Sequence, residues 1–351
     1  MSLEQAALPV FAGHQTFHPR FGWLKKGYDS VNEDQEIFNN PEAPLLLGVG
    51  KNMVEAIRFW GIATKVWSRI PHPSQKRTYL HVPTGFGKAL LSDDGFDPFL
   101  ELPGSLWLLH WYALSSPSSL PVWWLTFNEF SAVEFEDEGL DRFCLEEVAS
   151  TTWKQPNSSS IKKDVDCLLR MYTQRSAKGR QTLDDLLDSP FRELELIVPS
   201  GLGDRHFRFA LGAKATLPPE VLTFACLDYM ARTDPHSSSA TISRLTSDPG
   251  SPGRLFKLSE QSLLDALELG TAREPLVSIA APGGSPQLLV DGSASSCAET
   301  TLYDYYKARG SKARLRPGFS FAGSLGRLPI DDNALVSSRS ARAEREPVMS
   351  S

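Results

Sequence analysis

The chain has 351 residues, of which 41% are hydrophobic and 22% are charged, a mixture that excludes a disordered or coiled-coil protein. Its length predicts roughly two or three folded modules instead of one small core. The formal net charge of -6 excludes a protein that is basic throughout, so any nucleic-acid interface has to be a local patch of cations.

Cysteine spacing and the apolar runs bound the compartment. The four cysteines form neither a C-x-x-C pair nor a set with nearby histidines, which excludes the usual zinc sites and predicts buried, reduced thiols. The first residues lack the basic start and apolar run of a signal peptide. The run LWLLHWYAL is much too short to span a bilayer. We therefore expect a cytoplasmic protein that does not contact a membrane.

Residues 11–27, FAGHQTFHPRFGWLKKG, are the first stretch with chemical character. An imidazole can transfer a proton while a guanidinium and an ammonium bind phosphate, so His14, Arg20 and Lys26 are the candidate catalytic residues. Two alternatives stand beside this hypothesis. The aromatic residues anchor the segment while its cations reach solvent, or His14 and His18 ligate a metal, which the glycine and proline around them disfavour.

Residues 45–67, LLLGVGKNMVEAIRFWGIATKVW, predict a glycine turn followed by a buried amphipathic helix. The string GVGK is similar to a phosphate-binding loop. It lacks the glycine five residues before Gly50 and the serine or threonine after Lys51 that such a loop needs. The sequence therefore predicts no nucleotide site here.

Two helices and a hairpin follow in the order of a winged helix-turn-helix. Residues 140–150 place apolar side chains four apart, and residues 160–172, SIKKDVDCLLRMY, predict a second helix with Ser160 as its N-cap. Residues 192–212 alternate on both sides of a glycine-rich turn, which predicts a hairpin. The cations of the second helix and of the loop after it are candidate DNA contacts: Lys162, Lys163, Arg170, Arg175, Lys178 and Arg180. The alternative is a solvated helix face on a module that docks proteins.

The rest of the chain repeats this order of elements without repeating the sequence. We predict an α+β fold, mainly helical, with several modules and winged helix-turn-helix-like domains. The predicted divisions are an N-terminal module at 1–115, winged-helix-like modules at 116–215 and 216–310, and a flexible tail at 311–351, where periodic apolar positions are few.

Four strings in order, GHQTFHPRFGWLKKG, LGVGKNMVEAIRFW, SIKKDVDCLLRMY and SPGRLFKLSE, resemble the bacterial family DUF4007. The resemblance runs from about residue 10 to residue 307. Members of that family resemble the SspB component of the Ssp DNA phosphorothioation system, in which sulfur replaces a backbone oxygen and the modified DNA supports defence against phage.

The resemblance implies a DNA-binding, strand-nicking protein with Mg²⁺ or Mn²⁺ as cofactor and with metal ligands that are not assigned. It implies double-stranded DNA as a partner, together with a separate cysteine desulfurase, an ATPase and a sulfurtransferase-like enzyme. The alternative is a non-catalytic winged-helix adaptor that binds DNA and recruits the sulfur-transfer enzymes. The family strings assign no catalytic role to individual residues.

Overall fold

The computed structural model describes residues 1–173, 189–201, 203, 205–272 and 274–313. It is a mixed α/β structure in which helices dominate and the strands form small antiparallel sheets, as predicted from the sequence. Among the described helices, none is both long enough and apolar enough to cross a bilayer. The predicted burial of the cysteines is confirmed, because all four are buried and free.

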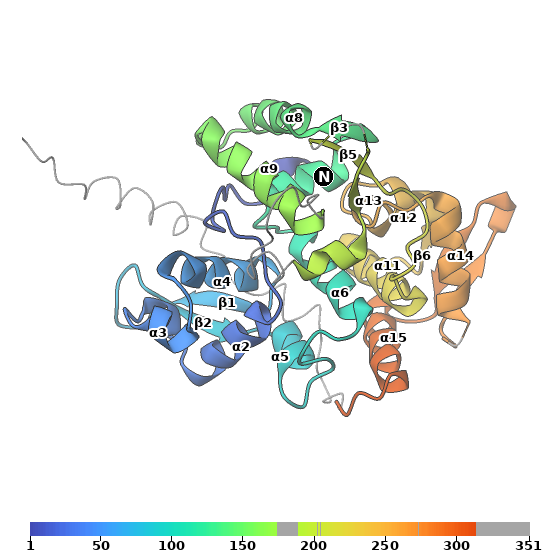
Figure 1. Ribbon diagram of the computed structural model, residues 1–351. Coiled ribbons are helices and arrows are strands. Elements are labelled where there is room, and N and C mark those ends of the chain that lie inside the picture. The colour runs from blue at the N-terminus through green and yellow to red at the C-terminus, as the bar shows by residue number, and fades with distance from the viewer. Residues whose placement is uncertain (174–188, 202, 204, 273, 314–351) are drawn as a thin grey trace, which may run out of the picture.

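The N-terminal elements surround one antiparallel hairpin, and Figure 1 shows them at the lower left. They are α1 (Leu3–Ala6), α2 (Trp23–Glu33), η1 (Ile37–Asn39), α3 (Ala43–Leu47), α4 (Lys51–Ala63), β1 (Trp67–Pro71), β2 (Tyr79–Pro83) and α5 (Gly85–Leu91). The helix predicted after the glycine turn is α4, which begins directly after Gly50. Its residue Gly61 lies against the Trp67 ring, where a Cβ atom would come within 1.9 Å of that ring, so the helix can lie close to the hairpin only with glycine there.

Two helices at the centre of the molecule are apolar on all sides. They are α6 (Pro103–Leu114) and α7 (Pro121–Asn128), and nearly every residue of both is buried. A helix that is hydrophobic all round has to be enclosed by other elements. Inside this enclosure His110 on α6 contacts the Tyr172 hydroxyl at 2.7 Å and the Leu255 carbonyl oxygen at 2.9 Å, which ties the two following units to the same helix.

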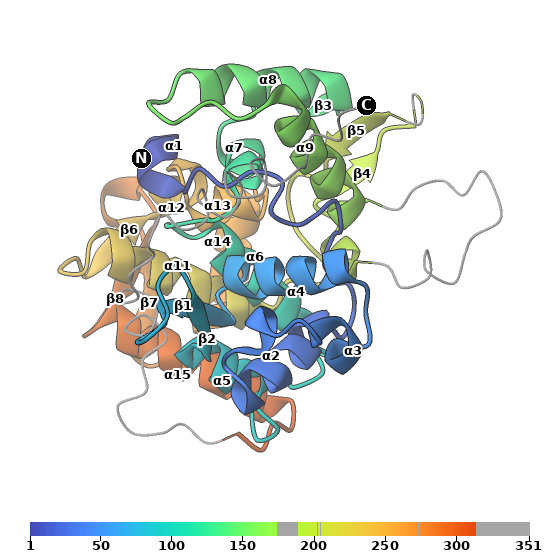
Figure 2. The ribbon, with the colours of Figure 1, turned by 90° about the vertical axis from the view of Figure 1, so that its left-hand side faces the viewer.

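The middle unit and the C-terminal unit share one order of elements, and Figure 2 shows the middle unit above the N-terminal elements. The middle unit contains β3 (Glu134–Glu136), α8 (Asp137–Ala149), α9 (Ser158–Tyr172), η2 (Pro190–Leu194), β4 (Ile197–Pro199) and β5 (His206–Phe209). The C-terminal unit contains α11 (Pro219–Thr233), β6 (Ser239–Thr241), α12 (Ile242–Ser247), α13 (Pro252–Leu255), α14 (Glu260–Thr271), β7 (Val277–Ala280), η3 (Pro282–Gly284), β8 (Gln287–Val290) and α15 (Ala294–Ala308). Their sheets have the orders β3-β5-β4 and β6-β8-β7, so in each the strand before the helices pairs with the last strand of the hairpin.

Two details differ from the pattern-based expectation. Helix α9 begins at Ser158 after Asn157, so Ser160 lies inside its first turn and is not the N-cap. The first strand of the hairpin is shorter than the alternation suggested, because Pro190–Leu194 form a 3-10 turn and the strand starts only at Ile197. In both places local hydrogen-bonding residues compete with the simple apolar period.

Candidate nucleic-acid interface

The segment 11–17 is an irregular strand of chain that lies across α9, although some 150 residues separate His14 from Asp164 on that helix. Its backbone turns sharply, since Ala12, Gln15 and Thr16 all have positive φ angles, of 50°, 51° and 68°. Such angles are unfavourable for residues other than glycine, so surrounding contacts have to hold them. Those contacts come mainly from α9 and from the aromatic side chains of α4 and α7.

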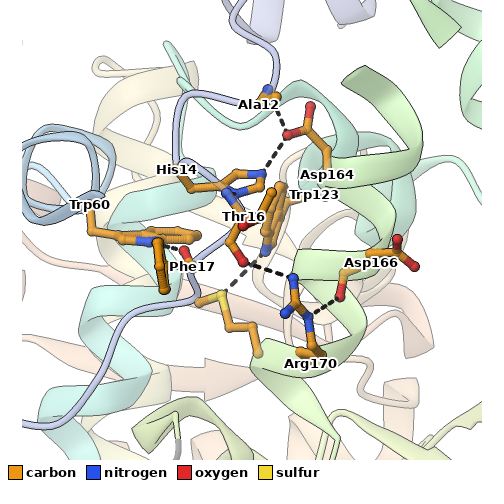
Figure 3. Close-up of polar contacts among 10 residues, drawn as sticks. Ala12, His14, Thr16, Phe17, Trp60, Trp123, Asp164, Asp166 and Arg170 are labelled. Carbon is orange, nitrogen blue, oxygen red and sulfur yellow. Dashed lines mark hydrogen bonds and ion pairs between the residues drawn. The ribbon is translucent and has the colours of Figure 1, made fainter. Parts of the chain in front are cut away.

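The contact with α9 is centred on the carboxylate of Asp164 (Figure 3). Asp164 Oδ1 accepts a hydrogen bond from the Ala12 backbone N–H at 2.7 Å and lies 2.6 Å from His14 Nε2. The Thr16 backbone N–H donates to His14 Nδ1, so that nitrogen carries no proton and Nε2–H donates to the carboxylate. Both side chains are almost completely inaccessible to solvent. We call this pair the His14–Asp164 clasp.

Aromatic rings enclose the imidazole of the clasp. His14 stacks on Trp60 and meets the edges of Phe59 and Trp123, with ring centroids about 6 Å apart in each case. The Trp60 indole N–H donates to the Phe17 carbonyl at 2.8 Å, which fixes the far end of the segment. With both ring nitrogens engaged and no exposed surface, His14 holds the segment on α9, and it does not present a free base to a substrate.

The other two candidate catalytic residues lie apart from the clasp. Lys26 Nζ donates to the Leu47 carbonyl at the end of α3, at 3.1 Å. The Arg20 guanidinium lies over the rings of Phe17 and Trp23, 5.8 and 5.5 Å from their centroids. The described contacts of His14, Arg20 and Lys26 therefore lead to three different parts of the fold.

Arg20 belongs instead to a group of cations around His18. Burial lowers the pKa of His18 to about 4, and the charges of Arg192, Arg170 and Arg20 lower that pKa as well. Arg170 donates from α9 to the Thr16 carbonyl at 2.7 Å and to the Asp166 carbonyl at 3.1 Å (Figure 3). Arg192 donates twice to the Arg170 carbonyl, at 3.2 Å. We call His18, Arg20, Arg170 and Arg192 the arginine cluster.

Lys162 and Lys163 lie in the first turns of α9 and are exposed. Helix α8 beside them is acidic, and this weakens the positive potential at that end of α9. Burial raises the pKa of Asp141 on α8, the Lys162 charge opposes that rise, and Asp166 adds to it. The cations of α9 are therefore concentrated at two places, the exposed first turns and the arginine cluster near its end. Arg175, Lys178 and Arg180 lie outside the described residues.

The comparisons with known proteins agree on one family. The model of the family described as protein of unknown function DUF4007 matches residues 11–306. The chain belongs to the DUF4007 family.

Two solved structures resemble this DUF4007 protein along almost its whole length. One is a magnesium-ion-bound crystal structure of SspB, with a TM-score of 0.85 and 35% identity, covering 99% of this chain and 100% of that one. The other is a crystal structure of SspB with a TM-score of 0.83 and 35% identity, covering 97% of each chain. No curated protein matches the sequence.

Sequence patterns alone assign no phosphate-binding role to His18 or Arg192. The spacing of His18 from His14 suggests only a metal ligand, and Arg192 lies in the strand pattern of the predicted hairpin. The string HPR places His18 near Arg20, but nothing in the sequence indicates that Arg170 and Arg192 fold against the same imidazole. Only tertiary structure brings these residues together.

Proposed function

We propose that this DUF4007 protein is the DNA-binding, strand-nicking component of a bacterial Ssp-type DNA phosphorothioation system. The observation that carries the proposal is its likeness to SspB, at 35% identity and with nearly complete coverage of both chains. Agreement over the full length supports a shared role more strongly than agreement over one module, because a single module is often reused for unrelated tasks. The proposed protein partners are the cysteine desulfurase, the ATPase and the sulfurtransferase-like enzyme of such a system.

The order of elements supports DNA binding by the middle unit. Strand, two helices and hairpin, with the first strand paired to the last, is the arrangement of a winged helix-turn-helix. In that arrangement α9 is the recognition helix, and its exposed first turns carry Lys162 and Lys163. The proposed contacts with DNA phosphates are these lysines, Arg170, and the loop cations Arg175, Lys178 and Arg180.

A divalent ion, Mg²⁺ or Mn²⁺, is the proposed cofactor, and one of the similar SspB structures is magnesium-bound. Within the residues that the structure describes, no three His, Cys, Asp or Glu side chains come together as a ligand group. The described part of the chain therefore contains no ready-made metal cage. Mg²⁺ often uses only one or two carboxylates, with waters and substrate phosphates as its other ligands, so bound DNA would have to complete such a site.

A plasmid assay tests the proposal. The purified protein is incubated with supercoiled plasmid and Mg²⁺ or Mn²⁺, and with a chelator as control. We expect conversion to the open circular form only with the ion, together with duplex binding that weakens as salt rises. Duplex binding without any nicking by protein of verified purity contradicts the catalytic part of the proposal. Absence of duplex binding at low salt contradicts the whole of it.

The second candidate function is the DNA-binding adaptor that recruits sulfur-transfer enzymes without cutting DNA. The placement of the expected catalytic residues favours it, because His14 is enclosed and Lys26 contacts a helix end. Variants of His14 and Arg20 separate the two candidates. If a nicking activity exists and survives both substitutions in folded protein, the chemistry lies elsewhere in the chain.

A further inference from the structure

The arginine cluster is the strongest feature of the described residues to which the sequence patterns assign no common role. Three guanidinium groups from distant parts of the chain surround one largely buried imidazole. Uncharged groups help to position each of them. Arg20 lies over two aromatic rings, Arg170 donates to two carbonyl oxygens, and Arg192 donates to the last turn of α9.

Such an arrangement favours the binding of an anion. Like charges gathered near a low-dielectric site repel one another, and their repulsion falls when a negative group binds among them. Guanidinium groups are well suited to this role, because several N–H donors lie in one plane and match the oxygens of a phosphate. Arg170 has N–H groups left for such a ligand, since its described contacts use only Nε and one terminal nitrogen.

We propose that the arginine cluster binds one phosphodiester group of a DNA backbone, with Arg20, Arg170 and Arg192 as its donors and His18 as a donor that is protonated on binding. The inference rests on the proposed DNA-binding function and names a site for it. Because Arg170 also belongs to α9, a phosphate there lies at the end of the proposed recognition helix that is opposite to Lys162.

The tautomer of His18 determines how protons enter. His18 Nδ1 lies 3.2 Å from the Pro19 carbonyl, which only accepts, so Nδ1 carries the proton of the neutral ring and Nε2 carries none. An anion can therefore receive a hydrogen bond from Nε2 only after the ring takes up a second proton. The charged groups acting on the ring are Arg192, Arg170 and Arg20, all cationic, and together with burial they lower the pKa of His18 to about 4. A bound anion offsets them, so binding is accompanied by proton uptake and strengthens as pH falls.

Sulfate and a short DNA duplex are the two probes. Sulfate keeps its charge over the relevant range of pH, so a pH dependence of its binding reports on the protein. We expect sulfate to shift the NMR signals of His18, to raise the pKa of His18, and to bind more tightly at about pH 5 than at about pH 7.5. We also expect sulfate to weaken duplex binding by competition.

Matched variants locate the effect. Arg192→Gln removes the charge but keeps an amide that can donate to the Arg170 carbonyl, and His18→Gln removes the titrating ring. Each is expected to weaken sulfate binding by about tenfold or more. Lys163→Gln removes an exposed cation outside the cluster and should leave sulfate binding unchanged. Circular dichroism confirms folding, and Arg20→Gln replaces any variant that fails to fold.

The outcomes distinguish this inference from the proposed function. If sulfate leaves the signals of His18 unchanged and folded Arg192→Gln binds the duplex like wild type, the site is wrong while DNA binding stands. If sulfate binds the cluster with proton uptake but no duplex is bound, the cluster holds a free anion and the proposed function fails.

Discussion

The His14–Asp164 clasp illustrates how a residue that appears catalytic in a sequence can be structural in the fold. A histidine in a string with arginine and two lysines resembles an acid–base group beside a phosphate site. In the folded protein its proton is directed at a buried carboxylate and its other nitrogen accepts a backbone N–H. The same pair supplies a partner to the Ala12 N–H, so one carboxylate satisfies two donors.

Breaking this pair should destabilise the protein. His14→Ala leaves a cavity among aromatic rings and removes one of the donors to a buried carboxylate, so we expect a decrease of about 3 kcal/mol in the free energy of unfolding. Asp164→Asn keeps an oxygen that accepts both hydrogen bonds, so its cost should be smaller, about 1–2 kcal/mol. Urea unfolding measures both values.

Lys163→Ala is the matched control, because Lys163 is exposed one residue from Asp164 and its removal should change stability by less than about 0.5 kcal/mol. A different result would restore the catalytic hypothesis. That result is a His14→Ala protein with the stability of wild type and no nicking activity.

At the scale of elements, α9 and α14 occupy the same place in units of the same order, yet their outer faces carry opposite charge. Lys162 and Lys163 are exposed on α9, whereas Glu260, Asp265 and Glu268 are exposed on α14. Figure 1 shows α14 at the right-hand edge of the molecule, with α9 at the upper left. Phosphate groups are attracted to the first face and repelled by the second.

We therefore expect DNA binding to depend on α9 alone of the two helices. Replacing Lys162 and Lys163 by Glu should weaken duplex binding and reduce the salt slope by about one unit for each phosphate group that the protein no longer neutralises. Adding Arg170→Glu should weaken binding further, but this residue also holds the Thr16 carbonyl and needs a separate folding control. Fluorescence anisotropy at several salt concentrations measures affinity and slope together.

The corresponding control neutralises α14, by Glu260→Gln, Asp265→Asn and Glu268→Gln. It removes charges from a helix in the equivalent place and should not weaken duplex binding. Equal decreases in affinity in both sets of variants contradict the assignment of α9 as the recognition helix.

The elements themselves were largely predictable from the sequence, because apolar period and turn residues decide them locally. The helix after Gly50, the helix containing Lys162 and the two hairpins were all expected. The sites were not predictable in the same way. Nothing local to residues 11–27 indicates that Asp164 receives the proton of His14, or that Arg192 acts on His18, since those interactions depend on how the middle unit packs against the N-terminal segment.

At the scale of the whole molecule, two enclosed helices, α6 and α7, serve as the common core of the units around them. Asp228 on α11 accepts a hydrogen bond from the Trp111 indole of α6 at 2.7 Å, just as His110 of α6 meets Tyr172 of α9. The boundary predicted near residue 115 falls between these helices. The proposed division into modules therefore concerns the order of elements, while the buried core is continuous.

The C-terminal limit of this core gives a prediction about truncation. Ala313 is buried, and its carbonyl accepts from Lys307 Nζ at 3.2 Å. Ending the chain after Ala313 should leave the thermal transition within about 2 °C of wild type, whereas ending it after Arg309 also removes this hydrogen bond and should cost about 1 kcal/mol. Calorimetry checks both. The tail predicted as flexible lies, from residue 314 on, outside the described residues, and a large decrease in stability in the longer protein would show that it packs on the core.

The attachment of the N-terminal segment to α9 has a consequence for biosynthesis. His14 leaves the ribosome 150 residues before Asp164 is added to the chain. At bacterial rates of synthesis this interval is roughly ten to thirty seconds, during which the aromatic side chains of the segment have no α9 to pack against. The first residues to be made are thus among the last to reach their native contacts, and nascent chains stalled before α9 should expose the segment to proteases and chaperones.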